Sequence, residues 1–231
     1  MIATGVWRVD VDSGGGHRMP DVADVRPLLE LCKQQDRAAF AELFAQYHQR
    51  VFRGAYVIAH HQEAADDITQ LVFVELFSAL HRFDLNRPFL PWLYRIVHNV
   101  SVDYLKRNRR AGETTPAMDG HLDALMGPDP DPSPADHAEQ AELRRAIWQA
   151  MGRLPANQRS VLMLCYYADL HEQEMATALH VRPGTVKSRL HRARQALRDE
   201  LTRGEHALTA EYTRYMADGA PYRESAQGGG E

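Results

Sequence analysis

Hydrophobic positions in the first half of the chain recur at spacings of three and four residues, the period of an amphipathic α-helix. The first helical stretch is predicted to start at Pro27, and its apolar face runs through Phe40, Leu43, Tyr47 and Val51. The alternation of period two that marks a half-buried strand does not compete with this pattern. The pattern therefore predicts helices from residue 27 to about residue 110.

A second helix is predicted from about Gln62 to Leu80 and a third from about Pro88, with a short loop over 84–88 between them. Proline suits the first turn of a helix, where no amide donor is needed. Lysine and arginine gather before Arg110, where cations favour the negative end of the helix dipole. The apolar stripe of the second helix contains Ile68, Leu71, Val72, Leu76 and Leu80.

Helical periodicity resumes near Glu139 and continues to Leu201 as four more helices, broken at Pro155, around Asp169 and over 182–184. The fold class is therefore predicted to be all-α, with two small helical domains joined by an acidic, proline-rich linker. The expected divisions are a disordered extension (1–26), a first domain (27–110), a linker (111–138), a second domain (139–202) and a C-terminal tail (203–231). The codons of the glycine triplet shortly before Met19 would resemble a ribosome-binding site, which predicts that translation starts at Met19. A genuine N-terminal extension is the alternative.

Charge is segregated along the chain, although the net charge is only −4. Between residues 111 and 143 there are eight acids and no lysine or arginine, whereas residues 175–198 contain six Lys/Arg and no acid. Five of the twelve prolines lie in 111–138, which favours a semi-extended linker. This distribution indicates a chain that contacts a polyanion at chosen places and avoids it elsewhere.

Residues 171–201 have the pattern of a helix-turn-helix. A short helix is followed by Val181 at the turn, and a second helix starts near Pro183, where Thr185 is placed to cap it. At about 100° per residue, Ser188, His191 and Arg192 point away from the buried face. Such a polar, cationic face suits entry into the major groove, while a solvated basic helix is the alternative. The inner stripe is Val186, Leu190, Ala193 and Leu197.

The segment RPGTVKSRLHRARQALRDEL resembles the recognition helix of sigma domain 4 in bacterial RNA polymerase sigma factors, which reads the promoter −35 element. The run at Leu154-Pro155, Gln158-Arg159 and Val161-Leu162 resembles the rest of that domain. His171 departs from the usual capping Ser or Thr, and His180 stands where Gly commonly makes the turn, a position with positive φ. The −35 contacts that the resemblance and the helical wheel predict are Thr185, Lys187, Ser188, Arg189, His191, Arg192 and Arg194.

Residues 39–110 resemble sigma domain 2. The segment FDLNRPFLPWLYRIVHNVSVDYLKRNRR looks like the part that opens and reads the −10 element, with the 84–88 loop as a pocket for a flipped base. Opening DNA requires groups that stack on an extruded base beside cations that hold the backbone. Trp92 has a core role as its alternative, because apolar residues surround it. The predicted −10 contacts are Asn86, Arg87, Tyr94, Arg95, His98 and Asn99.

The segment AADDITQLVFVELFSALHRF resembles the helix with which sigma factors dock on core RNA polymerase. Two adjacent carboxylates beside Phe73 and Phe77, both expected to be exposed, would make a protein-binding ridge. A solvated acidic face is the alternative. The predicted docking residues are Asp66, Asp67, Gln70 and Phe73.

Taken together, the resemblance implies a small sigma factor of the extracytoplasmic-function type, whose partners are core RNA polymerase and promoter DNA. The sequence leaves open an anti-sigma partner and a role for the tail. A helix-turn-helix regulator that acts without polymerase is the alternative. We expect no enzymatic activity, cofactor or metal, since HEQEM at 171–175 lacks the second His of a zinc-protease motif. No apolar run could span a bilayer, and with two distant cysteines a cytoplasmic protein is expected.

Overall fold

The computed structural model describes residues 22–110 and 145–203, and every regular element in these two ranges is helical. The predicted all-α class with two helical domains is therefore confirmed. The predicted linker, the start at Met19 and the tail beyond Arg203 lie outside the described residues. We call 22–110 the N-terminal domain and 145–203 the C-terminal domain.

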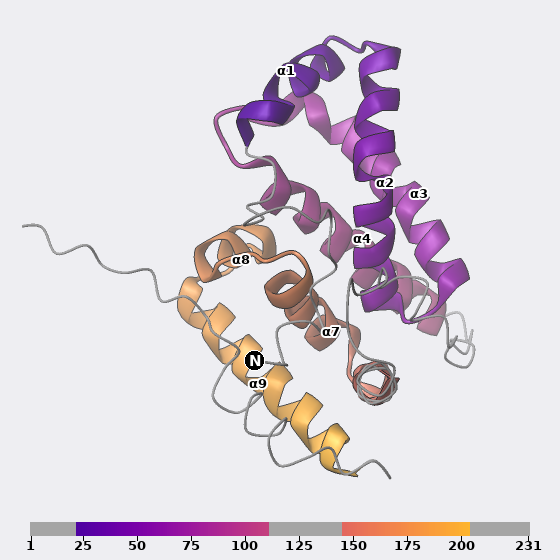
Figure 1. Cartoon of the computed structure of the whole chain (residues 1–231), viewed down its shortest axis with the longest axis vertical. Helices are drawn as coiled ribbons and strands as arrows, with labels where there is room; N and C mark the ends of the chain where they lie inside the picture. Colours follow the sequence, from indigo (N-terminus) through magenta and orange to yellow (C-terminus); the bar gives the residue numbers. More distant parts are fainter. Residues whose placement is uncertain (1–21, 111–144, 204–231) are drawn as a thin grey trace, which may run out of the picture.

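The N-terminal domain consists of four α-helices and one 3-10 turn, seen in indigo to magenta in Figure 1. Helices α2 and α3 pack along each other and against α4, and α1 lies across one end of α2. The elements are α1 (Val22–Lys33), α2 (Arg37–Ala59), α3 (Gln62–Ala79), η1 (Leu80–Arg82) and α4 (Phe89–Arg110).

Helix α1 begins at Val22, ahead of the boundary expected at residue 27, and Pro27 lies inside it. Proline removes one helical hydrogen bond. Tertiary packing offsets that loss, because Val25 and Leu29 of the same helix are buried. Lys33 at the end of α1 donates from Nζ to the carbonyl oxygen of Phe83 over 2.8 Å, which ties α1 to the end of η1.

The C-terminal domain starts with a helix over 145–153 and continues as a compact set of short helices. Its longest member, α9, lies along the outside of the set (Figure 1). The remaining elements are α7 (Ala156–Leu162), the π-helical η2 (Met163–Tyr167), α8 (Glu172–Leu179) and α9 (Pro183–Arg203).

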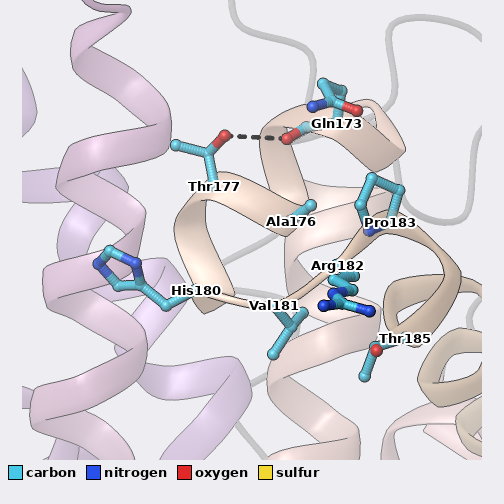
Figure 2. A pocket seen from close by; sticks show the side chains of 8 residues that line it. All are labelled: Gln173, Ala176, Thr177, His180, Val181, Arg182, Pro183 and Thr185. Carbon is cyan, nitrogen blue, oxygen red and sulfur yellow. Dashed lines mark hydrogen bonds between the residues drawn. The ribbon is translucent and has the colours of Figure 1, made fainter.

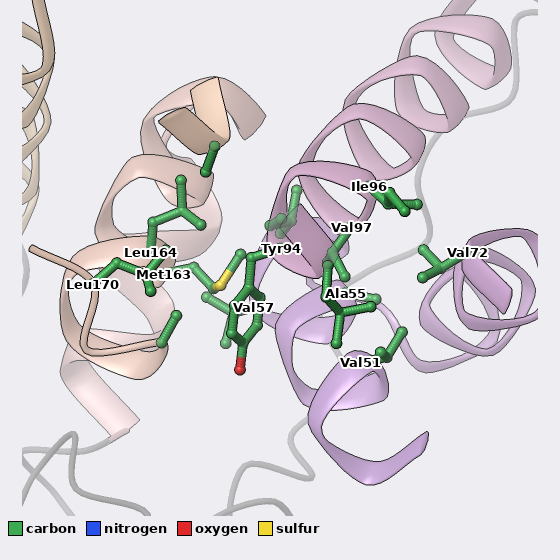
Figure 3. Close-up of a cluster of buried hydrophobic side chains, with 14 of the residues drawn as sticks. Val51, Ala55, Val57, Val72, Tyr94, Ile96, Val97, Met163, Leu164 and Leu170 are labelled. Atoms are coloured by element: carbon green, nitrogen blue, oxygen red, sulfur yellow. The ribbon is translucent and has the colours of Figure 1, made fainter. Parts of the chain in front are cut away.

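The buried apolar side chains of the two domains form one continuous cluster. Figure 3 shows its centre, where Met163 and Leu164 of η2 approach Tyr94 of α4 and Val57 of α2. Helices α2 and α4 thus contact their own domain on one side and the C-terminal domain on the other. The two domains therefore share a packed boundary, which we call the seam.

Candidate nucleic-acid interface

Helix α9 presents one apolar face to the C-terminal domain and one cationic face to solvent. All four residues of the predicted inner stripe are buried, with Val186 and Ala193 fully inaccessible. Because the buried stripe fixes the rotation of the helix, the opposite face is fixed as well. The exposed residues on it are Lys187, Ser188, Arg189, His191 and Arg192.

The other two predicted −35 residues, Thr185 and Arg194, are half-buried. The Arg194 side chain donates from Nε to the Tyr166 hydroxyl over 2.9 Å, and its guanidinium carbon lies 5.5 Å from the centre of that ring. Arg194 is thus engaged inside its own domain. Lys187 stays exposed, with Nζ 3.5 Å from a carboxylate oxygen of Glu172.

The turn between α8 and α9 has the predicted geometry despite its unusual residue. His180 has a φ of 52°, the left-handed region that normally favours glycine. Val181 donates its amide to Ala176 over 3.0 Å, which closes the turn. At the start of α8, Glu174 Oε2 accepts from the His171 amide over 2.8 Å, so a carboxylate supports the cap position.

Figure 2 shows a shallow hollow on this turn, lined by α8 residues, the turn itself and Thr185 at the start of α9. Thr177 faces it and donates from Oγ1 to the Gln173 carbonyl. In the same view His180 points toward a helix of the N-terminal domain. All the residues that line the hollow belong to the C-terminal domain.

The loop over 84–88 is exposed and internally hydrogen-bonded. Asp84 Oδ1 accepts from the amide of Asn86 at 3.0 Å and from its Nδ2 at 3.2 Å. The second oxygen of Asp84 lies 3.7 Å from Nε of Arg87. Both predicted −10 residues of this loop, Asn86 and Arg87, are exposed to solvent while they contact Asp84.

Beneath this loop lies a group of aromatic rings that includes Trp92. Its ring centre lies 4.5 Å from that of Phe83 and 5.9 Å from that of Phe89. Trp92 is half-buried among them. The packing therefore supports a core role for Trp92.

The predicted −10 residues of α4 lie at the seam, except Asn99, which is exposed. Tyr94 is only 1% exposed, so its expected access to DNA does not hold in this conformation. Burial, together with the nearby Tyr167 hydroxyl, raises the pKa of Tyr94. His98 is half-buried, and burial, assisted by Arg189, lowers its pKa to about 4.

Of the four residues predicted to form a docking ridge on α3, one is not exposed in the structure. Asp66, Asp67 and Gln70 are exposed, but Phe73 is buried, so its expected exposure is wrong. The Phe73 ring packs 4.5 Å from that of Phe44 on α2, which covers it. Asp67 Oδ2 accepts a 2.7 Å hydrogen bond from the Tyr104 hydroxyl.

An exposed apolar row, of which the sequence pattern predicted only Phe77, runs beside these carboxylates. Leu71 is 45% exposed, Val74 64% and Phe77 55%. The exposure of Phe77 is as predicted, whereas Leu71 was expected on the buried stripe. The spacing of three between these positions was the available signal, but it also fits a wide buried face.

Within the described ranges, no group of three or more His, Cys, Asp or Glu is placed to hold a metal ion. Cys32 is buried and Cys165 half-buried, and both are free thiols. None of the helices described here is both long enough and apolar enough to cross a membrane.

Comparison with known proteins connects both domains to one family. Residues 43–111 match the family model for Sigma-70 region 2, and residues 144–197 match that for Sigma-70, region 4. The extracytoplasmic-function (ECF) sigma factor SigW of Bacillus subtilis is 29% identical over 77% of this chain and 96% of its own length. The ECF sigma factor SigM of Mycobacterium tuberculosis is 32% identical over 81% of this chain and 87% of its own.

Among solved structures, CnrH in complex with the cytosolic domain of CnrY aligns with a TM-score of 0.53 and 26% identity, over 78% of this chain and 98% of that one. Because both sigma regions are present, a regulator that acts without polymerase is not favoured. The chain belongs to the ECF group of the sigma-70 family, and it is a sigma factor that directs transcription initiation.

Proposed function

We propose that this sigma factor reads the −35 element with the exposed face of α9. The observation that carries this proposal is the cationic face of Lys187, Arg189 and Arg192, which also contains the polar His191 and is held outward by a buried stripe. No acid interrupts the 24 residues from 175 to 198, so the side chains that α9 itself presents to the phosphates carry no negative charge. Arg192 is proposed to read a base, and Arg189 to hold a phosphate.

The −10 element is proposed to be read by the 84–88 loop and the adjoining part of α4. Asn86 and Arg87 are exposed on the loop, and the fixed Asp84 carboxylate supports their orientation. Asn99 is exposed further along α4. An extruded base would enter beside this amide and cation pair, while Trp92 stays in the aromatic group below.

Core RNA polymerase is proposed to dock on α3, with a revised set of residues. Asp66 and Gln70 remain in the set, and the apolar row of Leu71, Val74 and Phe77 takes the place of Phe73. An apolar row beside carboxylates has the composition of a protein interface, with a buried centre and a charged rim. The chain is proposed to act by binding alone, without a cofactor.

A protein that restrains the sigma factor is a further proposed partner. CnrH, which is 26% identical, was solved in complex with the cytosolic domain of CnrY. A comparable partner for this chain would be identified by co-purification with the full-length protein.

The −35 assignment is tested by comparing Arg192→Ala with Arg189→Ala. Arg192→Ala should cost about 1–3 kcal/mol of promoter binding and relax the preference at one base pair. Arg189→Ala should weaken binding evenly across sequences and lower the salt slope by about 1. Both are measured by fluorescence anisotropy with holoenzyme on a panel of single-base promoter variants.

Arg153→Ala is the matched control, because Arg153 is an exposed arginine of the same domain that lies outside α9. It should leave affinity and salt slope unchanged. Equal, sequence-independent losses for Arg192→Ala and Arg189→Ala would refute base reading by Arg192.

A further inference from the structure

Two arginines of α2, Arg50 and Arg53, lie in the stretch of that helix that packs against the C-terminal domain. A Cβ atom placed on Gly54, the residue after Arg53, would lie 3.7 Å from Met163 Sδ of η2 and 3.7 Å from Cε1 of Tyr94. Arg50 precedes Gly54 by four residues and therefore shares its face of α2. Both arginine side chains are half-buried, so each lies at the edge of the seam and still reaches solvent.

Three tyrosines from three elements lie around these guanidinium groups: Tyr47 of α2, Tyr94 of α4 and Tyr167 of η2. Burial raises the pKa of each hydroxyl, and the positive charge of Arg50 opposes that effect in all three. Arg53 acts on the pKa of Tyr167 in the same direction, through its charge and a side-chain hydrogen bond. Figure 3 shows the Tyr94 ring between η2 and α2. We call these five residues the arginine–tyrosine cluster.

The cluster contains two positive charges and, within the described ranges, no carboxylate that pairs with them. Neither Arg50 nor Arg53 forms an ion pair with an aspartate or glutamate there. Arg50 Nη1 and Arg53 Nε are buried and have no hydrogen-bond partner among the described residues. A charged donor that is removed from water without a partner is unfavourable. Such orphaned donors are rare in native proteins and point to an ion that completes the site.

The kind of donor and its direction select the class of ion. Guanidinium groups bind phosphate and carboxylate oxygens through charge-assisted hydrogen bonds. The Tyr167 hydroxyl adds a neutral donor from η2, because burial raises the pKa of Tyr167 to about 12 and the proton is retained at neutral pH. Donors that arrive from α2 on one side and from η2 on the other suit a tetrahedral anion better than a planar carboxylate.

We propose that the arginine–tyrosine cluster binds a small phosphate-bearing anion, which is held by α2 of one domain and η2 of the other. Tyr47 and Tyr94 are buried and close the inner end of the cluster, whereas Arg50, Arg53 and Tyr167 reach solvent. The phosphate belongs either to free inorganic phosphate or to a nucleotide. Because the ligand contacts both domains, it stabilises their packing at the seam.

This site is separate from the proposed DNA contacts, since Arg50, Arg53 and Tyr167 belong to none of them. The test is isothermal titration calorimetry of the full-length sigma factor with inorganic phosphate, ATP and acetate, at constant ionic strength. Phosphate should bind saturably and acetate more weakly. Arg50→Gln and Arg53→Gln should each weaken phosphate binding by about tenfold or more, because each variant loses a hydrogen bond from a charged donor. ATP that binds more tightly than phosphate, and is weakened by the same variants, would identify a nucleotide as the source.

Arg37→Gln is the matched control. Arg37 is an exposed arginine at the first residue of α2, several helical turns before Arg50, and its loss should leave phosphate affinity unchanged. Arg189→Ala distinguishes the cluster from the cationic face of α9. Phosphate binding that is lost in Arg189→Ala but retained in Arg50→Gln would place the anion on α9 and overturn the proposal. A wild-type protein that binds neither phosphate nor ATP would also overturn it.

A second variant keeps the proposal testable if loss of either arginine prevents folding, which circular dichroism would detect. Tyr167→Phe removes one oxygen and retains the ring, and it should weaken phosphate binding by about threefold to tenfold. Amide hydrogen exchange then locates the ligand in the full-length protein. Saturating phosphate should slow exchange in η2 and in the middle of α2, and leave α9 unchanged. Unchanged affinity in folded Tyr167→Phe, or protection confined to α9, would refute a site shared by the two domains.

Discussion

Replacement of Arg159 by methionine should destabilise the protein by about 2–6 kcal/mol. The guanidinium donates three hydrogen bonds to backbone carbonyls: to Leu154 at 2.6 Å, to Ile58 at 2.7 Å and to Gly152 at 3.3 Å. Hydrogen bonds from a charged donor contribute about 1.5–3 kcal/mol each, which gives about 5–9 kcal/mol for the three. Methionine keeps the aliphatic packing but leaves these carbonyls without their donor.

Desolvation of the guanidinium offsets part of that gain. Burial lowers the pKa of Arg159 to about 10 from 12.5, which corresponds to about 3 kcal/mol at about 1.4 kcal/mol for each pKa unit. The difference between the two contributions gives the expected loss. A lysine has one ammonium group in place of the planar fork, so Arg159→Lys should recover less than half of it.

The assay is urea unfolding followed by circular dichroism at pH 7. Arg153→Met is the matched control, because the Arg153 side chain is 56% exposed and its nearest carboxylate, that of Glu200, lies 3.9 Å away. That substitution should cost less than about 0.5 kcal/mol. The reasoning is refuted if Arg159→Met unfolds within about 0.5 kcal/mol of the wild type, or if the control loses as much.

Two further predictions concern acid stability and polymerase docking. Burial, and then the charge of Arg159, lowers the pKa of His60 to about 3, so the unfolded chain takes up a proton from about pH 6.5 downward while the folded chain does not. The stability contributed by neutral His60 is therefore lost as the pH falls, by about 2 kcal/mol at pH 5. In His60→Asn, the decrease in the free energy of unfolding between pH 7 and pH 5, measured by urea unfolding, should be smaller by that amount. An equal decrease in the wild type and the variant would contradict the lowered pKa of His60. Asp66→Lys combined with Phe77→Ala should abolish pull-down of core polymerase while helicity stays intact. The control Glu30→Lys on α1 should leave the pull-down unchanged. Full retention of core polymerase by the double variant would remove α3 from the docking surface.

The sequence by itself determined the local features of the proposed −35 surface. The spacing of Val186, Leu190 and Leu197 fixed which face of α9 is buried, and the turn position of His180 was identified from the motif. Both depend on interactions between residues a few positions apart. Periodicity reports such interactions directly, because a helix has a fixed rotation for each residue.

The tertiary structure decided which polar and aromatic faces are covered. On α3, periodicity could not distinguish Leu71 from Phe73, because the neighbours of the helix determine how wide its buried face is, and Phe44 of α2 covers Phe73. On α4, the residues around Tyr94 have the composition of a DNA-binding site, yet the C-terminal domain packs against Tyr94 and buries it. Pairs such as His98 with Ser160 leave no local signal, because the residues are 62 positions apart and meet only when two separately patterned domains pack together.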